Sequence, residues 1–370
     1  QTLAEGGLAS AWGGACTYFD DTTLRDLGLP PQEMRRSYEE LTRMIGISGP
    51  PLHPHVQPPL HPDHHARLLL AAASHRSERL AAIHATVRQP HSAMLTETLG
   101  QRRPCMYNDL EYYSDADQSL YRANFTLDEL RKNTYFTYTP HVRIERIEET
   151  SNAAFVHGHL FSNNDVRTPI REEGKVVILA AGAMGTGRIL LESLRCYDTP
   201  LPFISKPHAF TACLHPRTIG QTGDDRRSAL CQLLVTIPPT ASHVGVCTQL
   251  YSYRSFLLYR LLPQLSFPIP ESLNILRLFT PSLMIAGIRF ASPGANGTMT
   301  LTRNGVLSIH IPEQVQSNVR YRRALRDMKR ALRIVGLLPL RTRFMPEGSS
   351  FHYAGAVPIT SADTTTLNAE

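Results

Sequence analysis

The chain has 370 residues, of which 42% are hydrophobic and 19% are charged. This composition allows one large or two ordinary domains with a sizeable core, and it argues against global disorder. The net charge of +6 is mild for this length and the arginines are spread along the chain, so nothing favours a nucleic-acid-binding protein.

The cysteines and the apolar runs bear on the class of protein. None of the six cysteines forms a Cys-x-x-Cys pair or a zinc-type spacing, so a reduced, intracellular protein is preferred over an exported one. No charged-then-apolar leader follows Gln1, and we expect the natural start to precede it. Charges and prolines break the most apolar region, 256–279, which predicts a domain core rather than a transmembrane or interfacial segment.

The first 130 residues predict helices around a long loop. A proline at a first helical position, an apolar face and Gly46 as a stop predict a helix over 31–45. Residues 49–65 are rich in proline and histidine and predict an exposed loop or lid. We interpret its histidines as solvated rather than metal-binding: His53, His55, His61, His64 and His65. Helical periodicity returns over 66–87.

Strand patterns begin near Tyr135. Phe136, Tyr138 and the segments 141–147 and 154–161 predict short strands. Residues 175–180 form an uninterrupted apolar run, which is typical of a strand covered on both faces. Glycines at 182, 185 and 187 follow this run, and an apolar helix comes after them.

Two elements are predicted in the last quarter of the chain. Residues 298–311 predict a hairpin with the turn Arg303-Asn304-Gly305, in which Asn304 and Gly305 would both have positive φ. Residues 321–335 predict an amphipathic helix whose basic side is interpreted as solvated rather than as an acidic-surface or nucleic-acid contact. Its apolar face consists of Tyr321, Leu325, Met328, Leu332 and Val335.

Three glycine-bearing segments could contact a ligand. Residues 5–15 place the only tryptophan between two glycine pairs, which suits either a close approach to a ligand or a buried aromatic over a turn. In the segment 175–194, helix N-terminal amide groups could bind phosphate, although an ordinary strand-to-helix turn is favoured on this segment alone. In residues 348–356, small neighbours leave room for a ligand beside His352, and an imidazole can accept an alcohol proton.

In this order, the three segments resemble those of the glucose–methanol–choline oxidoreductases. The resemblance implies a mixed α/β fold with a discontinuous FAD-binding domain over 1–50, 136–198 and 345–370. It also implies a cofactor-covering region over 51–135. A substrate-binding domain built on a largely antiparallel sheet is implied over 199–344.

The resemblance also implies the site residues and the reaction. His352 would be the catalytic base, and an alcohol, sugar or sterol CH–OH group would be oxidised by hydride transfer to flavin N5. Ala11 stands where one branch of the family attaches the flavin covalently, so FAD would be bound non-covalently. The implied cofactor-binding residues are Gly6, Gly7, Trp12, Gly13, Gly14 and Ala15 beside the flavin ring, Val142 at the adenine, and Ala181 and Gly182 along the nucleotide.

The chain departs from the family pattern in several places. Gly187 replaces a usual proline, which we expect to loosen the helix start, and Cys105 alone precedes the Thr-Leu-Asp-Glu-Leu stretch, so no metal or redox role is expected there. The family's dinucleotide fingerprint and closing segment do not appear. We therefore expect this chain as given to bind FAD weakly or not at all.

Two alternatives stay open. A non-catalytic fragment or pseudoenzyme could retain only a ligand-binding domain. A dehydrogenase using NAD is less favoured, because no acidic residue ends a strand about 20 residues beyond Gly182. The sequence leaves the substrate, the electron acceptor, the oligomeric state and the localisation undetermined.

Overall fold

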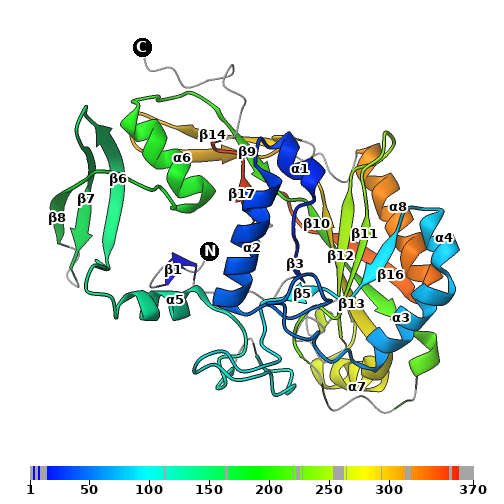
Figure 1. Ribbon diagram of the computed structural model, residues 1–370. Helices are drawn as coiled ribbons and strands as arrows, with labels where there is room; N and C mark the ends of the chain where they lie inside the picture. Colours follow the sequence, from blue (N-terminus) through cyan, green and yellow to red (C-terminus); the bar gives the residue numbers. More distant parts are fainter. Residues whose placement is uncertain are drawn as a thin grey trace.

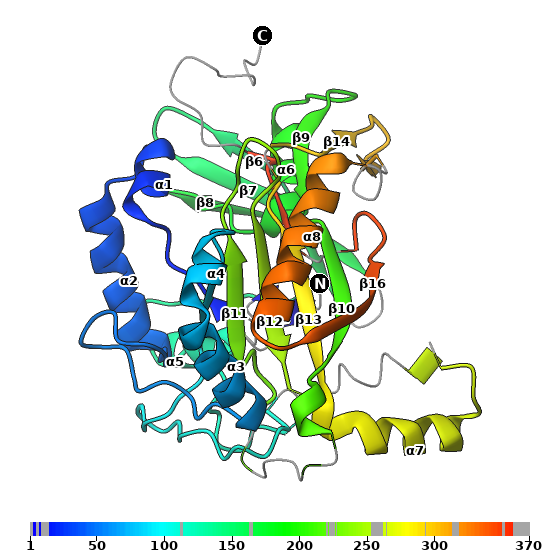
Figure 2. The same ribbon diagram turned by 90° about the vertical axis from the view of Figure 1, so that its right-hand side faces the viewer.

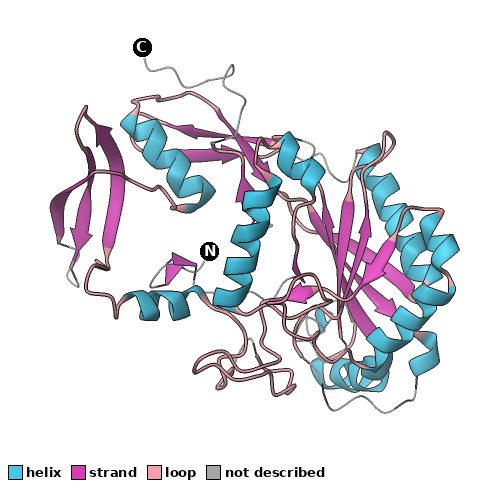
Figure 3. Cartoon of the chain, in the orientation of Figure 1, coloured by secondary structure: helices cyan, strands magenta, loops and turns pink. Residues whose placement is uncertain are grey.

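The computed structural model describes most of the chain. The described residues are 15–111, 114–162, 166–219, 221, 226, 228–252, 262–263, 265–292, 294–312, 318–349 and 352–357, with the two-residue strands Leu3–Ala4 (β1) and Gly7–Leu8 (β2). Within these residues the protein is mixed α/β, with eight α-helices, and every pairing between named strands is antiparallel (Figures 1 and 3).

A six-stranded sheet forms the largest unit. Its order is β16-β10-β13-β12-β11-β4. Its strands are β4 (Thr86–Arg88), β10 (His208–Leu214), β11 (Leu233–Ile237), β12 (Val246–Tyr251), β13 (Leu283–Phe290) and β16 (Leu338–Phe344). Alternate residues of each strand point to opposite faces, so the two faces carry different chemistry.

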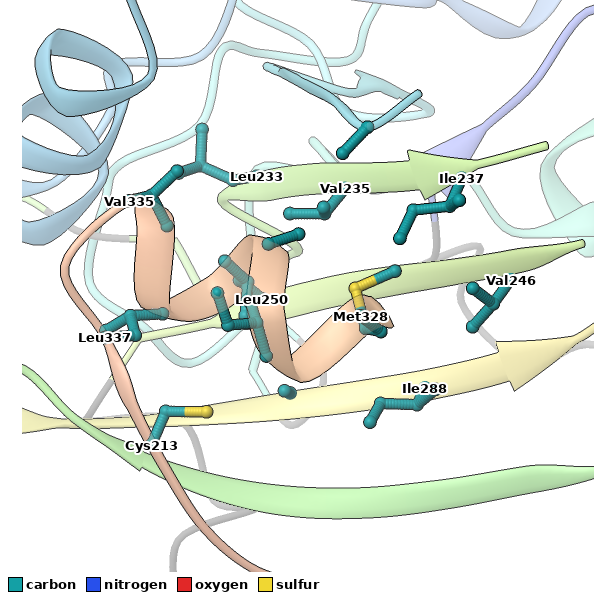
Figure 4. Close-up of a cluster of buried hydrophobic side chains, with 14 of the residues drawn as sticks. Cys213, Leu233, Val235, Ile237, Val246, Leu250, Ile288, Met328, Val335 and Leu337 are labelled. Atoms are coloured by element: carbon teal, nitrogen blue, oxygen red, sulfur yellow. The ribbon is translucent and has the colours of Figure 1, made fainter. Parts of the chain in front are cut away.

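Three helices cover one face of this sheet: α3 (His64–His75), α4 (Ser77–Ala81) and α8 (Val319–Ile334) (Figure 2). Asn318 caps α8, because its side chain accepts a hydrogen bond from the Arg320 amide at 2.9 Å. The predicted apolar face of α8 is confirmed, and Met328 lies fully buried against Val235 and Ile288 (Figure 4). Burial of this face, rather than helix propensity, holds the arginine-rich helix in place.

A four-stranded sheet, order β15-β14-β9-β17, lies beside helix α6 (Gly182–Ser193) (Figure 1). Its strands are β9 (Leu201–Ser205), β14 (Gly297–Leu301), β15 (Leu307–His310) and β17 (Tyr353–Ala354). Phe203 and Met299 are fully buried between the sheet and α6. This second core fixes β17, the strand that directly follows His352.

The third sheet has the order β6-β7-β8 and stands at the left of Figure 1. Strands β6 (Val142–Glu149) and β7 (Ala154–Phe161) confirm the prediction, whereas β8 (Arg167–Gly174) was not predicted. The prediction of strands at Phe136 and Tyr138 was wrong. The Phe136 amide instead bonds the Asn133 carbonyl at 3.1 Å and closes a turn.

The remaining elements connect these units. They are β3 (Ala15–Cys16), α1 (Asp21–Asp26), α2 (Pro31–Ile45), β5 (His91–Ser92), α5 (Ala123–Leu130), α7 (Ile269–Phe279) and the short 3-10 turns η1 (Pro216–Thr218) and η3 (Thr280–Ser282). The helix α2 ends as predicted, with Gly46 at φ 75°. None of the helices in the described part of the chain is long and apolar enough to cross a membrane.

The predicted loop over 49–65 extends two residues too far, because α3 begins at His64. Asp63 caps α3 by accepting a hydrogen bond from the Ala66 amide at 2.8 Å, so His64 and His65 are helical. Only 1% of the His65 surface is exposed, so this histidine is buried rather than solvated.

The predicted buried strand at 175–180 is wrong. These residues are neither helix nor strand, and Val176 and Ile178 are 78% and 86% exposed. A strand of this kind needs a neighbouring strand for its backbone groups. No described residue forms a backbone hydrogen bond with residues 175–180.

The hairpin β14–β15 and its turn residues Arg303, Asn304 and Gly305 are confirmed, but the predicted positive φ at Asn304 is wrong. The Thr302 amide bonds the Val306 carbonyl at 3.0 Å, which leaves a three-residue loop. Only Gly305 has positive φ, at 75°, and Asn304 does not. A three-residue loop needs the left-handed conformation at its last position only, which glycine supplies here.

Candidate functional site

His352 lies where the two large sheets meet. It directly precedes β17, and Tyr353 pairs with Ser205 at the end of β9. The backbone of His352 accepts a hydrogen bond from the Lys206 amide at 3.3 Å. Strand β10 begins two residues after Lys206 and belongs to the six-stranded sheet. The packing of β9 and β17 therefore holds His352 beside the start of β10.

The surroundings of His352 are cationic. The pKa of its imidazole is lowered, first by partial burial and then by the positive charges of Arg289 and Lys206. The pKa of Lys206 is also lowered, by burial and by Arg289, although part of its side chain reaches solvent. A neutral imidazole can accept a proton, so the site suits a general base at neutral pH.

The N-terminus of α6 is open. Ala181 occupies the cap position without a side-chain hydrogen bond, and Gly182 has φ 72°. Both residues are exposed, so the first amide groups of a twelve-residue helix face an open region. Such amide groups and the helix dipole favour a phosphate.

The segments around Gly182 and His352 lie side by side. Met184 of α6 and Tyr353 pack against the same core, and both line a hollow together with Phe203 and Ile309. A side chain at Gly187 would collide with Met299 and approach Ala356 to 3.1 Å. Two of the three segments singled out in the sequence are therefore neighbours in space.

The family resemblance led us to expect that Gly187 loosens the start of α6, but Gly187 does not lie at that start. It is the sixth residue of the helix and is buried. Close packing on Met299 and Ala356 leaves no room for a β-carbon there, which explains a glycine inside a helix.

The other predicted cofactor residues are placed in part. Val142 begins β6 opposite Leu160 and is half-buried. Ala15 pairs with Ser92 of β5, and Gly7 pairs with Ala4 in a short hairpin. Gly6, Trp12, Gly13 and Gly14 lie outside the described residues. The assignment of the tryptophan turn to a flavin ring thus stays a prediction.

The predicted domain boundaries also stay a prediction. Strand β4, from the covering region 51–135, forms one edge of the six-stranded sheet, while β17 of the last segment pairs with β9. Elements assigned to different predicted domains therefore share sheets.

The cysteines and histidines of the described residues offer no metal site, since no three His, Cys, Asp or Glu side chains in this part are arranged to hold an ion. Cys105 is buried and donates to Glu111 Oε1 at 3.2 Å. Burial and the nearby carboxylate raise the pKa of this thiol far above its usual range, so it is unreactive. All six cysteines are free.

Sequence reasoning missed Lys206 and Arg289. In β13, apolar side chains at Ala286, Ile288 and Phe290 alternate with Gly287 and Arg289. This alternation marks Arg289 as a charged position on a strand with one buried face. It is the signal by which the sequence could have identified Arg289 as a site residue.

No family model matches the chain, and no curated protein matches it.

Proposed function

We propose that this protein is an FAD-dependent oxidoreductase that acts on the CH–OH group of an alcohol, with His352 as the general base. The observation that supports this most directly is the position of His352 beside Lys206 and Arg289, directly before Tyr353, which packs in the same core as Met184 of α6. The resemblance of the three glycine-bearing segments to the glucose–methanol–choline oxidoreductases gives the reaction class.

The residues around α6 suit part of a dinucleotide site. The uncapped amide groups after Ala181 and the positive φ of Gly182 leave backbone available to a phosphate or ribose. When bound, FAD supplies the two-electron acceptor for the alcohol. Val142 and the residues around Ala15 are the further positions that would hold it.

The chain's own contribution to the reaction is proton transfer. His352 accepts the hydroxyl proton of the alcohol as the carbinol carbon becomes a carbonyl. Partial burial, followed by the charges of Arg289 and Lys206, lowers the pKa of the imidazole, and β9 and β17 fix the position of His352. A positioned base of this kind accelerates the reaction by ~10²- to 10⁴-fold.

The test compares wild type with His352→Ala, each as the full-length protein from its natural source. We expect a visible flavin absorption band in both proteins and alcohol-dependent dye reduction that falls by ~10²- to 10⁴-fold in the variant. His75→Ala, at the exposed end of α3, is the matched control and keeps wild-type turnover.

Two outcomes contradict the proposal. Undiminished turnover in His352→Ala removes the histidine from the reaction. A wild-type protein with neither flavin nor alcohol oxidation supports the alternative, a non-catalytic protein that retains a ligand-binding sheet.

A further inference from the structure

The face of the six-stranded sheet opposite α3, α4 and α8 carries cations in two cross-strand rows. In the first row, pairing runs from Arg343 through Phe210, Gly287, Gln249 and Leu234 to Arg88. In the second row, it runs from His208 through Arg289, Cys247 and Thr236 to Thr86. No position in either row is an aspartate or glutamate.

Arg289 is held in place at the centre of this face. Its guanidinium contacts the Tyr251 hydroxyl, and Tyr251 donates to Gln249 Oε1 at 2.6 Å. Arg289 Nη1 also donates to the Gly287 carbonyl at 3.4 Å. A β-carbon at Gly287 would lie 3.4 Å from that same nitrogen, so glycine leaves the space in which the guanidinium lies. Such support keeps an arginine ordered and ready to bind.

Arg289 and Lys206 have no carboxylate partner in the part of the chain that the structure describes. Among the described residues, neither forms an ion pair. Glu347 lines a small cavity with Lys206 and His208, and its charge also acts on Tyr321. Two neighbouring cations without a counter-ion repel each other, and an anionic ligand relieves that repulsion.

We propose that the alcohol bound beside His352 carries an oxyanion, a carboxylate or a phosphate, and that Arg289 and Lys206 bind it. This inference rests on the proposed function for the alcohol group. The evidence for the anion site is independent of it and consists of the charges and the strand pairing of the sheet. A planar guanidinium suits a carboxylate or phosphate by two parallel hydrogen bonds, and the lysine adds a mobile donor. His352 then lies next to the hydroxyl end of the same molecule.

The experiment measures binding by NMR, through the ring signals of His352 in the full chain at constant ionic strength. The probes are two matched pairs: lactate with propane-1,2-diol, and glycerol 3-phosphate with glycerol. We expect the charged member of at least one pair to bind about tenfold or more tightly than its neutral partner. The two pairs distinguish a carboxylate from a phosphate. Bound anion also raises the pKa of His352 toward its ordinary value, because it offsets the two positive charges.

Variants separate this site from general electrostatic attraction. Arg289→Gln and Lys206→Gln should each reduce the preference for the charged probe to about threefold or less. Arg322→Gln, at an exposed position on α8 over the other face, is the control and leaves the preference unchanged. Lys206 is partly exposed, so its variant provides the test if Arg289→Gln does not fold.

Equal affinity for charged and neutral probes overturns the inference, as does an equal effect of Arg322→Gln. Neither result depends on flavin or turnover. Loss of turnover in His352→Ala without an anion preference supports the proposed function and rejects the anion site. An anion preference with unchanged turnover in His352→Ala supports the anion site and rejects the proposed function.

Discussion

At the scale of single residues, burial decides what the histidines do. His65 lies at the start of α3, where its Nε2 is 3.0 Å from Thr218 Oγ1 and its ring is 5.8 Å from the ring of His215. Burial, followed by the neighbouring His215, lowers the pKa of His65 to about 4. His352, by contrast, keeps part of its surface open to a ligand.

The buried histidine predicts loss of stability in acid. Because the folded-state pKa of His65 lies below the unfolded value of 6.5, its stabilising effect is complete above pH 6.5. That effect is lost as the pH falls toward about 4, where the protein should be less stable by up to about 3 kcal/mol. Urea unfolding of wild type and His65→Gln across this range measures the difference. His75→Gln, exposed on the same helix, should keep the wild-type pH dependence, and an equally steep profile in His65→Gln would exclude His65 as the cause.

At the scale of elements, local pattern predicted the helices better than the strands. The apolar face of α8 and the stop at Gly46 are encoded within a few residues, and both are confirmed. The segment 175–180 has the composition of a buried strand, but the described residues provide no partner strand. A helix satisfies its own backbone groups, whereas a strand depends on a neighbour.

The exposed segment 175–180 predicts tolerance to polar substitution. Val176→Thr and Ile178→Thr together should change the free energy of unfolding by only about 0.5 kcal/mol, because both side chains are already in water. They should also reduce self-association seen by light scattering, since an extended apolar edge is prone to pairing. Val235→Thr, at a fully buried position in β11, should cost about 1–3 kcal/mol as the matched control. A comparable cost for the double variant would mean that 175–180 is buried in solution.

At the scale of the whole molecule, one core joins distant segments. Helix α3 and strand β4 from the first quarter pack with β10–β13 and with α8 from the last quarter. Met328 is fully buried at the centre of this core (Figure 4). The sheet that carries Arg289 on one face is therefore stabilised from the other face.

This arrangement predicts that a single core deletion is felt globally. Met328→Ala should lower the free energy of unfolding by about 2–5 kcal/mol, because it removes buried apolar surface and leaves a cavity. Met44→Ala, at a position that is 52% exposed on α2, should have almost no effect. Denaturant unfolding followed by circular dichroism compares the two variants, and equal losses would show that α8 does not cover the sheet as described.

The sequence by itself determined the mixed α/β class, the helices α2 and α8, the strands β6 and β7 and the hairpin β14–β15, because their patterns act over a few residues. It also drew attention to His352 and Gly182. Only the tertiary structure placed these two segments side by side and brought Lys206 and Arg289 to the histidine. Lys206 comes from the link between β9 and β10, and Arg289 comes from β13. Contacts between residues so far apart depend on how the sheets pair and pack, and no local pattern specifies them.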